Sequence, residues 1–210
     1  MRSLALAAFV LGATLPSFAK DKLPGFDSPE KAFHAYCTGV VSVDFDLMLS
    51  SLTSEAKAYH VALSLFSAAF LFGQDPEMQK VFREHGIEPS SDDGGDGQTE
   101  KADEDSPDRA LVEAVSKIKN PGKLMKQIAD RHEKLAKLMA SSGDARPESA
   151  RPTAKELLSS VTLGKMAMKR NSAVATVTVA APAKDVFSTM PEKVKFRKIK
   201  SRWYCHIDPR

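Results

Sequence analysis

The sequence offers little support for the common kinds of covalent or cofactor chemistry. It has two cysteines, one tryptophan and three tyrosines among 210 residues. Neither the Gly-x-Ser-x-Gly motif of nucleophilic hydrolases nor a glycine-rich phosphate-binding motif occurs. Cys-x-x-Cys-His is missing, and Cys205-His206 alone provides too few ligands for zinc. The sequence therefore predicts no cofactor, no metal ion and no covalently attached haem.

Long apolar runs and a strong excess of one charge are missing as well. The apolar runs 4–15 and 61–72 are each 12 residues long, whereas a membrane-spanning helix needs about 20. The formal net charge is +3, without the concentrated basic excess of a dedicated nucleic-acid binder. We therefore expect neither a nucleic-acid partner nor, in the mature chain, an integral membrane segment.

The first 19 residues have the pattern of a cleavable signal peptide. Arg2 supplies the positive charge, 4–15 form the apolar stretch, and Pro16 precedes a small-x-small cleavage site that ends at Ala19. No cysteine stands directly after the apolar stretch, which argues against a lipoprotein anchor. We expect a periplasmic or secreted protein whose residues 20–210 form a single domain.

Helix-capping residues and apolar periodicity predict a helical region followed by a sheet. Helices are expected over 29–41, 44–51, 53–72, 76–85, 110–118, 122–140 and 154–158. Alternating, β-branched segments predict strands over 161–168, 172–180, 194–200 and 202–207. The very apolar segment 61–72 is expected to be a buried core helix. The predicted fold class is α+β, with N-terminal helices packed on an antiparallel meander of about four strands.

An acidic stretch interrupts the helical region. Residues 88–106 have few apolar side chains and many acids, which predicts a disordered surface loop. A calcium-binding loop is the alternative, but Gly94 and Asp103 stand where such a loop needs a carboxylate and a glutamate. Residues 107–152 are expected to be a helical insertion followed by a linker.

Cys37 and Cys205 are expected to face the core. Cys37 lies in the apolar stripe of the first helix, and Cys205 alternates with Trp203 and Ile207 on the last strand. Two alternatives stay open: a disulfide between them, or two buried free thiols.

Several local motifs together resemble a known superfamily. They are Ser-Pro-Glu-x-Ala-Phe-x-Ala-Tyr at 28–36, Asp-Phe-Asp-x-Met at 44–48, Leu-Thr-Ser-Glu-Ala at 52–56 and Lys-Ser-Arg-Trp-Tyr at 200–204. With these motifs the chain resembles secreted bacterial members of the nuclear transport factor 2-like superfamily. The resemblance implies a conical α+β fold with a pocket between a curved sheet and the first helix. Members of that superfamily include isomerases, dehydratases, hydrolases and non-enzymatic binding domains.

The expected pocket suggests two sets of residues. Those expected to contact a small apolar ligand or a protein partner are Tyr36, Tyr59, Phe66, Phe70 and Trp203. If the protein is instead an isomerase or hydrolase, His60 with Asp44 or Asp46 would be its acid/base pair. We favour the non-enzymatic binding domain.

A third hypothesis concerns the C-terminal hairpin. Its basic residues are Lys193, Lys195, Arg197, Lys198, Lys200 and Arg202. Lysines on a strand edge commonly serve to prevent aggregation. The functional alternative is binding to an anionic surface.

Overall fold

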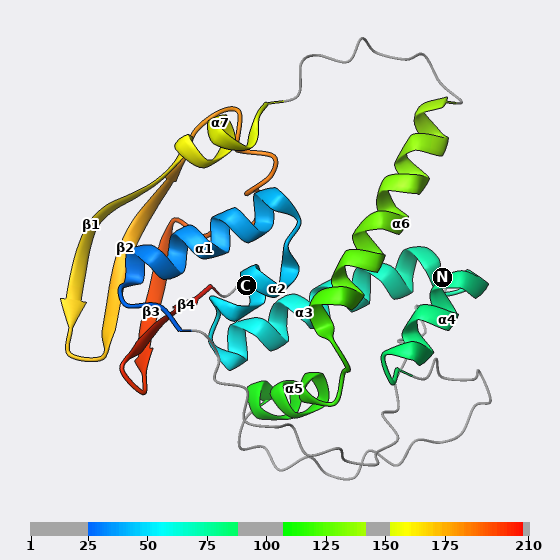
Figure 1. Ribbon diagram of the computed structural model, residues 1–210, viewed down its shortest axis with the longest axis horizontal. Helices are drawn as coiled ribbons and strands as arrows, with labels where there is room; N and C mark the ends of the chain where they lie inside the picture. Colours follow the sequence, from blue (N-terminus) through cyan, green and yellow to red (C-terminus); the bar gives the residue numbers. More distant parts are fainter. Residues whose placement is uncertain (1–24, 88–106, 142–151, 208–210) are drawn as a thin grey trace, which may run out of the picture.

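A computed structural model describes residues 25–87, 107–141 and 152–207. Figure 1 shows a bundle of helices on one side of a four-stranded sheet. The predicted signal peptide and the acidic loop 88–106 lie outside the described residues.

The helices begin within one residue of their predicted starts, except for α5, which begins three residues earlier than predicted. They are α1 (Pro29–Ser42), α2 (Phe45–Ser50), α3 (Ser54–Phe72), α4 (Pro76–Glu84), α5 (Pro107–Ser116), α6 (Pro121–Ser141) and α7 (Ala154–Ser159). The Ser28 hydroxyl accepts a hydrogen bond from the Lys31 amide at the start of α1. Thr153 and Glu156 form a reciprocal capping box at the start of α7.

The sheet is the predicted antiparallel meander. Its strands are β1 (Val161–Lys169), β2 (Ser172–Val179), β3 (Lys193–Ile199) and β4 (Arg202–His206), and they lie side by side in chain order. The two residues between β3 and β4, Lys200 and Ser201, have φ angles of 47° and 66°. Positive φ at both positions is typical of the tight turn that matches strand twist. The α+β fold class is thus confirmed.

The core lies between α1 and the inner face of the sheet. Val194 and Phe196 on β3 and Cys205 on β4 are fully buried, and Phe33 and Cys37 of α1 belong to the same cluster. On β4, Trp203 and Cys205 are buried as predicted, as is Ile207 just after it, and Tyr204, expected on the other face, is buried as well. In this way α1 packs on the inner face of the sheet, with its closest contacts to β4.

The region predicted as an insertion joins this core. Val115 and Ile118, at and just after the end of α5, and Leu124 and Ile128 of α6 are buried in the same cluster as the α1 residues. α6 packs against α2, α3 and α4. These helices therefore contribute to the interior.

The outer edge of β4 is paired by two segments from far upstream in the chain. The Phe26 and Trp203 amides each donate to the other residue's carbonyl, at 3.2 and 2.8 Å. Cys205 donates to Ser51 and accepts from Thr53, at 2.7 and 2.9 Å. This backbone pairing satisfies an edge that would otherwise expose unpaired donors and acceptors.

Candidate functional site

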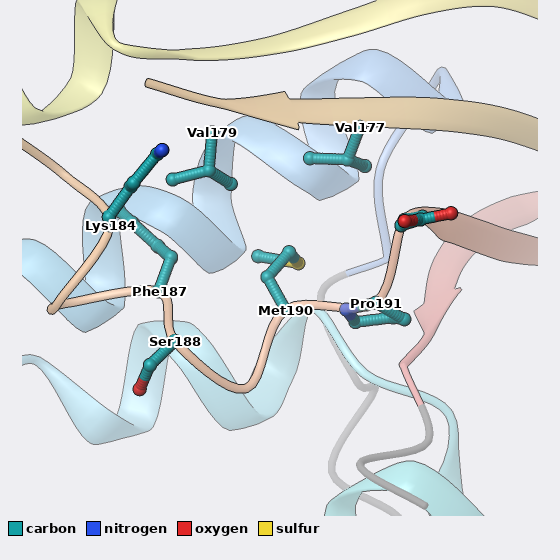
Figure 2. A pocket seen from close by; sticks show the side chains of 8 residues that line it. Val177, Val179, Lys184, Phe187, Ser188, Met190 and Pro191 are labelled. Atoms are coloured by element: carbon teal, nitrogen blue, oxygen red, sulfur yellow. The ribbon is translucent and has the colours of Figure 1, made fainter. Parts of the chain in front are cut away.

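A hollow lies at the end of the sheet where β2 extends beyond its pairing with β3. Pairing of β2 with β3 stops at Thr176 and Lys193, but β2 continues to Val179. Residues 180–192 connect the two strands, and they pass below the last residues of β2 (Figure 2). Together they line an open surface hollow of about 300 Å³, which we call the β2–β3 pocket. Its volume is at the lower limit of known small-molecule sites.

The walls of the β2–β3 pocket are mainly apolar. Val177 and Val179 face it from β2, while Phe187, Met190 and Pro191 line it from the connection. Figure 2 shows the two valines on one side of the hollow and Met190 on the other. Phe187 is buried, which anchors this part of the connection in the core cluster. An apolar part of a ligand could therefore be removed from water here.

Opposite charges flank this apolar space. The Val177 amide donates to the Glu192 carbonyl at 2.7 Å, which places Glu192 beside Val177. Lys184 lies near Val179 in Figure 2, at the other end of the pocket. Since Val177 and Val179 are two residues apart on a strand, the ends of the pocket are separated by about 7 Å. Lys184 and Glu192, both exposed, thus add one basic and one acidic residue to the lining of the pocket.

The lining residues offer binding groups and little chemistry. Ser188 is the sole hydroxyl of the lining, and none of the lining residues is a histidine or a cysteine that could activate it. The arrangement can hold and orient a molecule through one charge and apolar contact. The sequence analysis missed this pocket, because none of its residues falls in a recognisable motif.

The five residues expected to bind a ligand are divided between different places. Tyr36 and Trp203 are core residues, each only 5% exposed. Phe66 and Phe70 are 66% and 76% exposed on α3, and Tyr59 is half-buried on the same helix. None of the five lines the β2–β3 pocket.

One face of α3 is exposed and apolar, which corrects the prediction of a buried core helix. Val61, Ala68 and Phe72 are buried on its inner face. Tyr59, Leu63, Phe66 and Phe70 follow one another at spacings of four, three and four residues on the opposite face. We call these four residues the α3 stripe. The segment is apolar enough for a core helix, but the other helices cover only one side of it.

The three candidates for acid/base chemistry each have a structural contact. The Asp44 carboxylate caps α2 by accepting from the Leu47 amide at 2.9 Å. The Asp46 carboxylate lies against Gly122 of α6, so a side chain at residue 122 would displace it. The His60 ring lies 5.9 Å from the Tyr36 ring, centre to centre. These contacts account for the positions of all three, and a catalytic pair of His60 with either acid stays a prediction.

The disulfide is absent from the structure, and the alternative of two buried thiols is the correct one. Desolvation by burial raises the pKa of the Cys37 thiol to about 12. Burial, with Cys37 nearby, also raises the pKa of Cys205 well above its usual range. Because the thiolate is the form that attacks another sulfur, burial keeps this pair in its unreactive form.

Two polar clusters, one around the buried His85 and one around the partly exposed Arg131, were not predicted. The buried ring of His85, which follows α4, contacts the carbonyl of Lys119 through Nδ1, and Nε2 lies 2.8 Å from Gln127 Oε1 on α6. Arg131 of α6 pairs with Asp75 at 2.5 Å and with Glu77 at 2.8 Å. Both clusters join α6 to the α4 region, so their location indicates a role in packing.

The part of the chain that the structure describes contains no group of three or more His, Cys, Asp or Glu residues able to hold a metal ion. Within the same residues, no helix is both long and apolar enough to cross a bilayer.

Comparison with family models, with curated proteins and with solved structures finds no match for this chain. The resemblance to the nuclear transport factor 2-like superfamily therefore stays a prediction.

Proposed function

We propose that this protein is a binding domain that holds a small amphipathic ligand in the β2–β3 pocket. The observation that carries the proposal is a mainly apolar surface hollow whose lining includes one basic and one acidic residue, Lys184 and Glu192. An apolar body would contact Val177, Val179 and Met190, and an anionic group would lie at Lys184. A few polar groups around an apolar hollow is the usual composition of a small-molecule site.

Two expectations from the sequence support this proposal, one on the location of the protein and one on its ligand-binding role. The signal-peptide pattern of residues 1–19 favours a periplasmic or secreted binding protein. The resemblance to the nuclear transport factor 2-like superfamily favours a ligand-binding α+β domain. The same resemblance leaves the isomerase or hydrolase alternative open, with His60 and Asp44 or Asp46 as its residues.

A pair of fluorescent naphthalene probes tests the pocket. Anilinonaphthalene sulfonate has an anionic group, and N-phenylnaphthylamine has a similar apolar body without it. Replacing Val177→Phe narrows the cavity and should weaken both probes. Replacing Lys184→Gln should weaken the sulfonate about fivefold, the equivalent of about 1 kcal/mol for an exposed ion pair, and leave the neutral probe unchanged.

The matched control is Lys155→Gln, which removes another exposed lysine on α7, away from the pocket. All variants carry Phe66→Ser and Phe70→Ser, so that the α3 stripe does not bind the probe. If Val177→Phe leaves the affinity of both probes unchanged, the pocket is not the binding site and the proposal fails.

A second candidate function is self-association through the α3 stripe. Spacings of four, three and four residues are those of a helix that packs along another helix. Residues 58–74 contain no Asp, Glu, Lys or Arg, so a two-fold pairing of this face would bring no like charges together. Analytical ultracentrifugation should then show a dimer that Phe66→Ser with Phe70→Ser converts to a monomer. A monomeric wild-type protein would rule this function out.

A further inference from the structure

The sheet carries positive charges and no negative ones. Its basic residues are Lys165 and Lys169 on β1, Lys193, Lys195, Arg197 and Lys198 on β3, and Arg202 on β4. None of the four strands contains an Asp or a Glu. The positive charge therefore extends beyond the C-terminal hairpin to the opposite edge of the sheet.

Most of these side chains point away from the helices. Val194 and Phe196 face the core, so the alternation of a strand turns Lys193, Lys195 and Arg197 outward. Lys169 lies in register with Ser172, which in turn pairs with Arg197. Figure 1 shows the helices on the other side of the sheet.

Lys165 belongs to the same outer surface because of a β-bulge. The register of β1 on β2 shifts between Leu163 and Met166, so two residues of β1 oppose Thr176. One of them, Gly164, lies against the Thr176 hydroxyl, and Lys165 beside it is exposed. We call Lys165, Lys169, Lys193 and Lys195 together the basic face.

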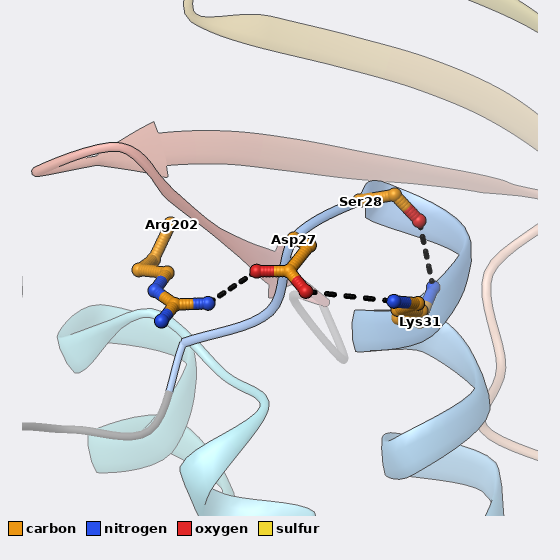
Figure 3. Close-up of polar contacts among 4 residues, drawn as sticks. All are labelled: Asp27, Ser28, Lys31 and Arg202. Atoms are coloured by element: carbon orange, nitrogen blue, oxygen red, sulfur yellow. Dashed lines mark hydrogen bonds and ion pairs between the residues drawn. The ribbon is translucent and has the colours of Figure 1, made fainter.

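The remaining basic residues of β3 and β4 are already engaged. Arg197 pairs with Glu55 at 3.3 Å, and Arg202 pairs with Asp27, which also holds Lys31 (Figure 3). The Lys198 ammonium lies 5.8 Å from the centre of the Trp203 ring. By contrast, Lys193 and Lys195 form no ion pair with any residue that the structure describes. Their charges are available to a partner.

The spacing of the basic face lets its charges act together. Alternate residues of β3 are about 7 Å apart, and β1 and β3 are two strand spacings, about 10 Å, apart. These separations do not exceed the Debye length of about 10 Å at 0.1 M salt. The potentials of the lysines therefore add, and a partner with many negative charges gains more than a single ion would.

We propose that the basic face is a docking surface for a bilayer rich in acidic phospholipids. On β1 and β3 the sheet presents its exposed lysines along a broad surface rather than within a groove. Val174 and Ile199, 39% and 43% exposed, lie on the same side and can contact the headgroup region. The one tyrosine on this side, Tyr204, is buried, so it offers no aromatic surface for nucleic-acid bases. This inference is independent of the β2–β3 pocket.

Sedimentation with vesicles tests the proposal. The full chain should bind vesicles of phosphatidylcholine with about 30% phosphatidylglycerol and should not bind pure phosphatidylcholine. Raising the salt concentration from about 0.05 M to about 0.5 M should release it. Replacing Lys193→Gln and Lys195→Gln should weaken binding about 30-fold, at about 1 kcal/mol for each lysine.

Two matched variants make the test specific. Lys123→Gln with Lys126→Gln removes the same charge from exposed lysines of α6 and should bind like the wild type. Lys193→Arg with Lys195→Arg keeps the charge on the basic face and should also bind like the wild type. Circular dichroism checks that each variant is folded. The proposal is overturned if the α6 variant binds acidic vesicles as weakly as the variant with Lys193→Gln and Lys195→Gln. It is also overturned if the wild-type protein binds heparin or single-stranded DNA but does not bind acidic vesicles.

Discussion

The buried thiol of Cys37 makes the stability of the fold sensitive to alkaline pH. Burial raises its pKa from 9.0 to about 12, because the thiolate would lose its hydration in the core. In the unfolded chain the same thiol ionises near its ordinary pKa, so above that pH the unfolded state binds fewer protons than the folded one. The free energy of unfolding is therefore unaffected below about pH 9 and falls progressively as the pH rises towards about 12.

The size of this loss in the free energy of unfolding follows from the difference between the pKa values of Cys37 in the folded and unfolded states. Each pH unit between the two pKa values corresponds to 1.36 kcal/mol, so Cys37 should lower the free energy of unfolding by about 2 kcal/mol at about pH 10.5. Cys205 should add a loss of the same sign, because burial raises its pKa as well. The raised pKa of the Tyr36 hydroxyl acts in the same direction at higher pH.

Urea unfolding of the wild type and of Cys37→Ala, each at about pH 8 and about pH 10.5, isolates the contribution of Cys37. The alanine variant is less stable at both pH values because it packs less well. Between the two pH values, however, its free energy of unfolding should fall by about 2 kcal/mol less than that of the wild type. The other titrating groups are the same in both proteins, so their effects cancel in the comparison. With reductant present throughout, an equal alkaline loss in both proteins would refute the claim that this thiol is buried and protonated.

Three further predictions concern packing, capping and the exposed helix face. Phe196→Ala in the core of the sheet should lower the free energy of unfolding by about 3–5 kcal/mol, whereas Val174→Ala on the outer side of the neighbouring strand should lower it by roughly 0.5 kcal/mol or less, as measured in urea. Thr153→Ala removes the capping box of α7 and should cost about 1 kcal/mol in the same assay, and no loss would show that the cap is not needed. Phe66→Ser should leave the free energy of unfolding within about 0.5 kcal/mol of the wild type, because the side chain is 66% exposed; a larger loss would show that the α3 stripe is buried.

Much of the fold could be predicted because its signals are local. Ser28 followed by Pro29 marks the start of α1, and Asp75 followed by Pro76 marks the start of α4, through hydrogen bonds within a few residues. The alternation on β4 correctly placed Trp203 in the core. Each of these features depends on neighbours in the chain, so the sequence around it is sufficient.

The candidate sites were harder to predict because they depend on contacts between distant segments. Arg131 reaches Asp75 across 56 residues, and no local pattern joins them. The β2–β3 pocket exists because β2 extends beyond its last residue pair with β3, and the connection between the two strands passes below Val179. Phe70 has the composition of a core residue and is nevertheless exposed, since its own sequence does not show how far other helices cover α3.

By itself the sequence determined the positions of the helices and strands, the α+β class and the alternation of inward and outward side chains, because caps, turns and apolar periodicity act over a few residues. Only the tertiary structure decided which faces are covered, and with them the β2–β3 pocket, the two free thiols and the uncovered basic face. The physical reason is that burial depends on what packs against a surface, and here those contacts join segments that are far apart in the chain.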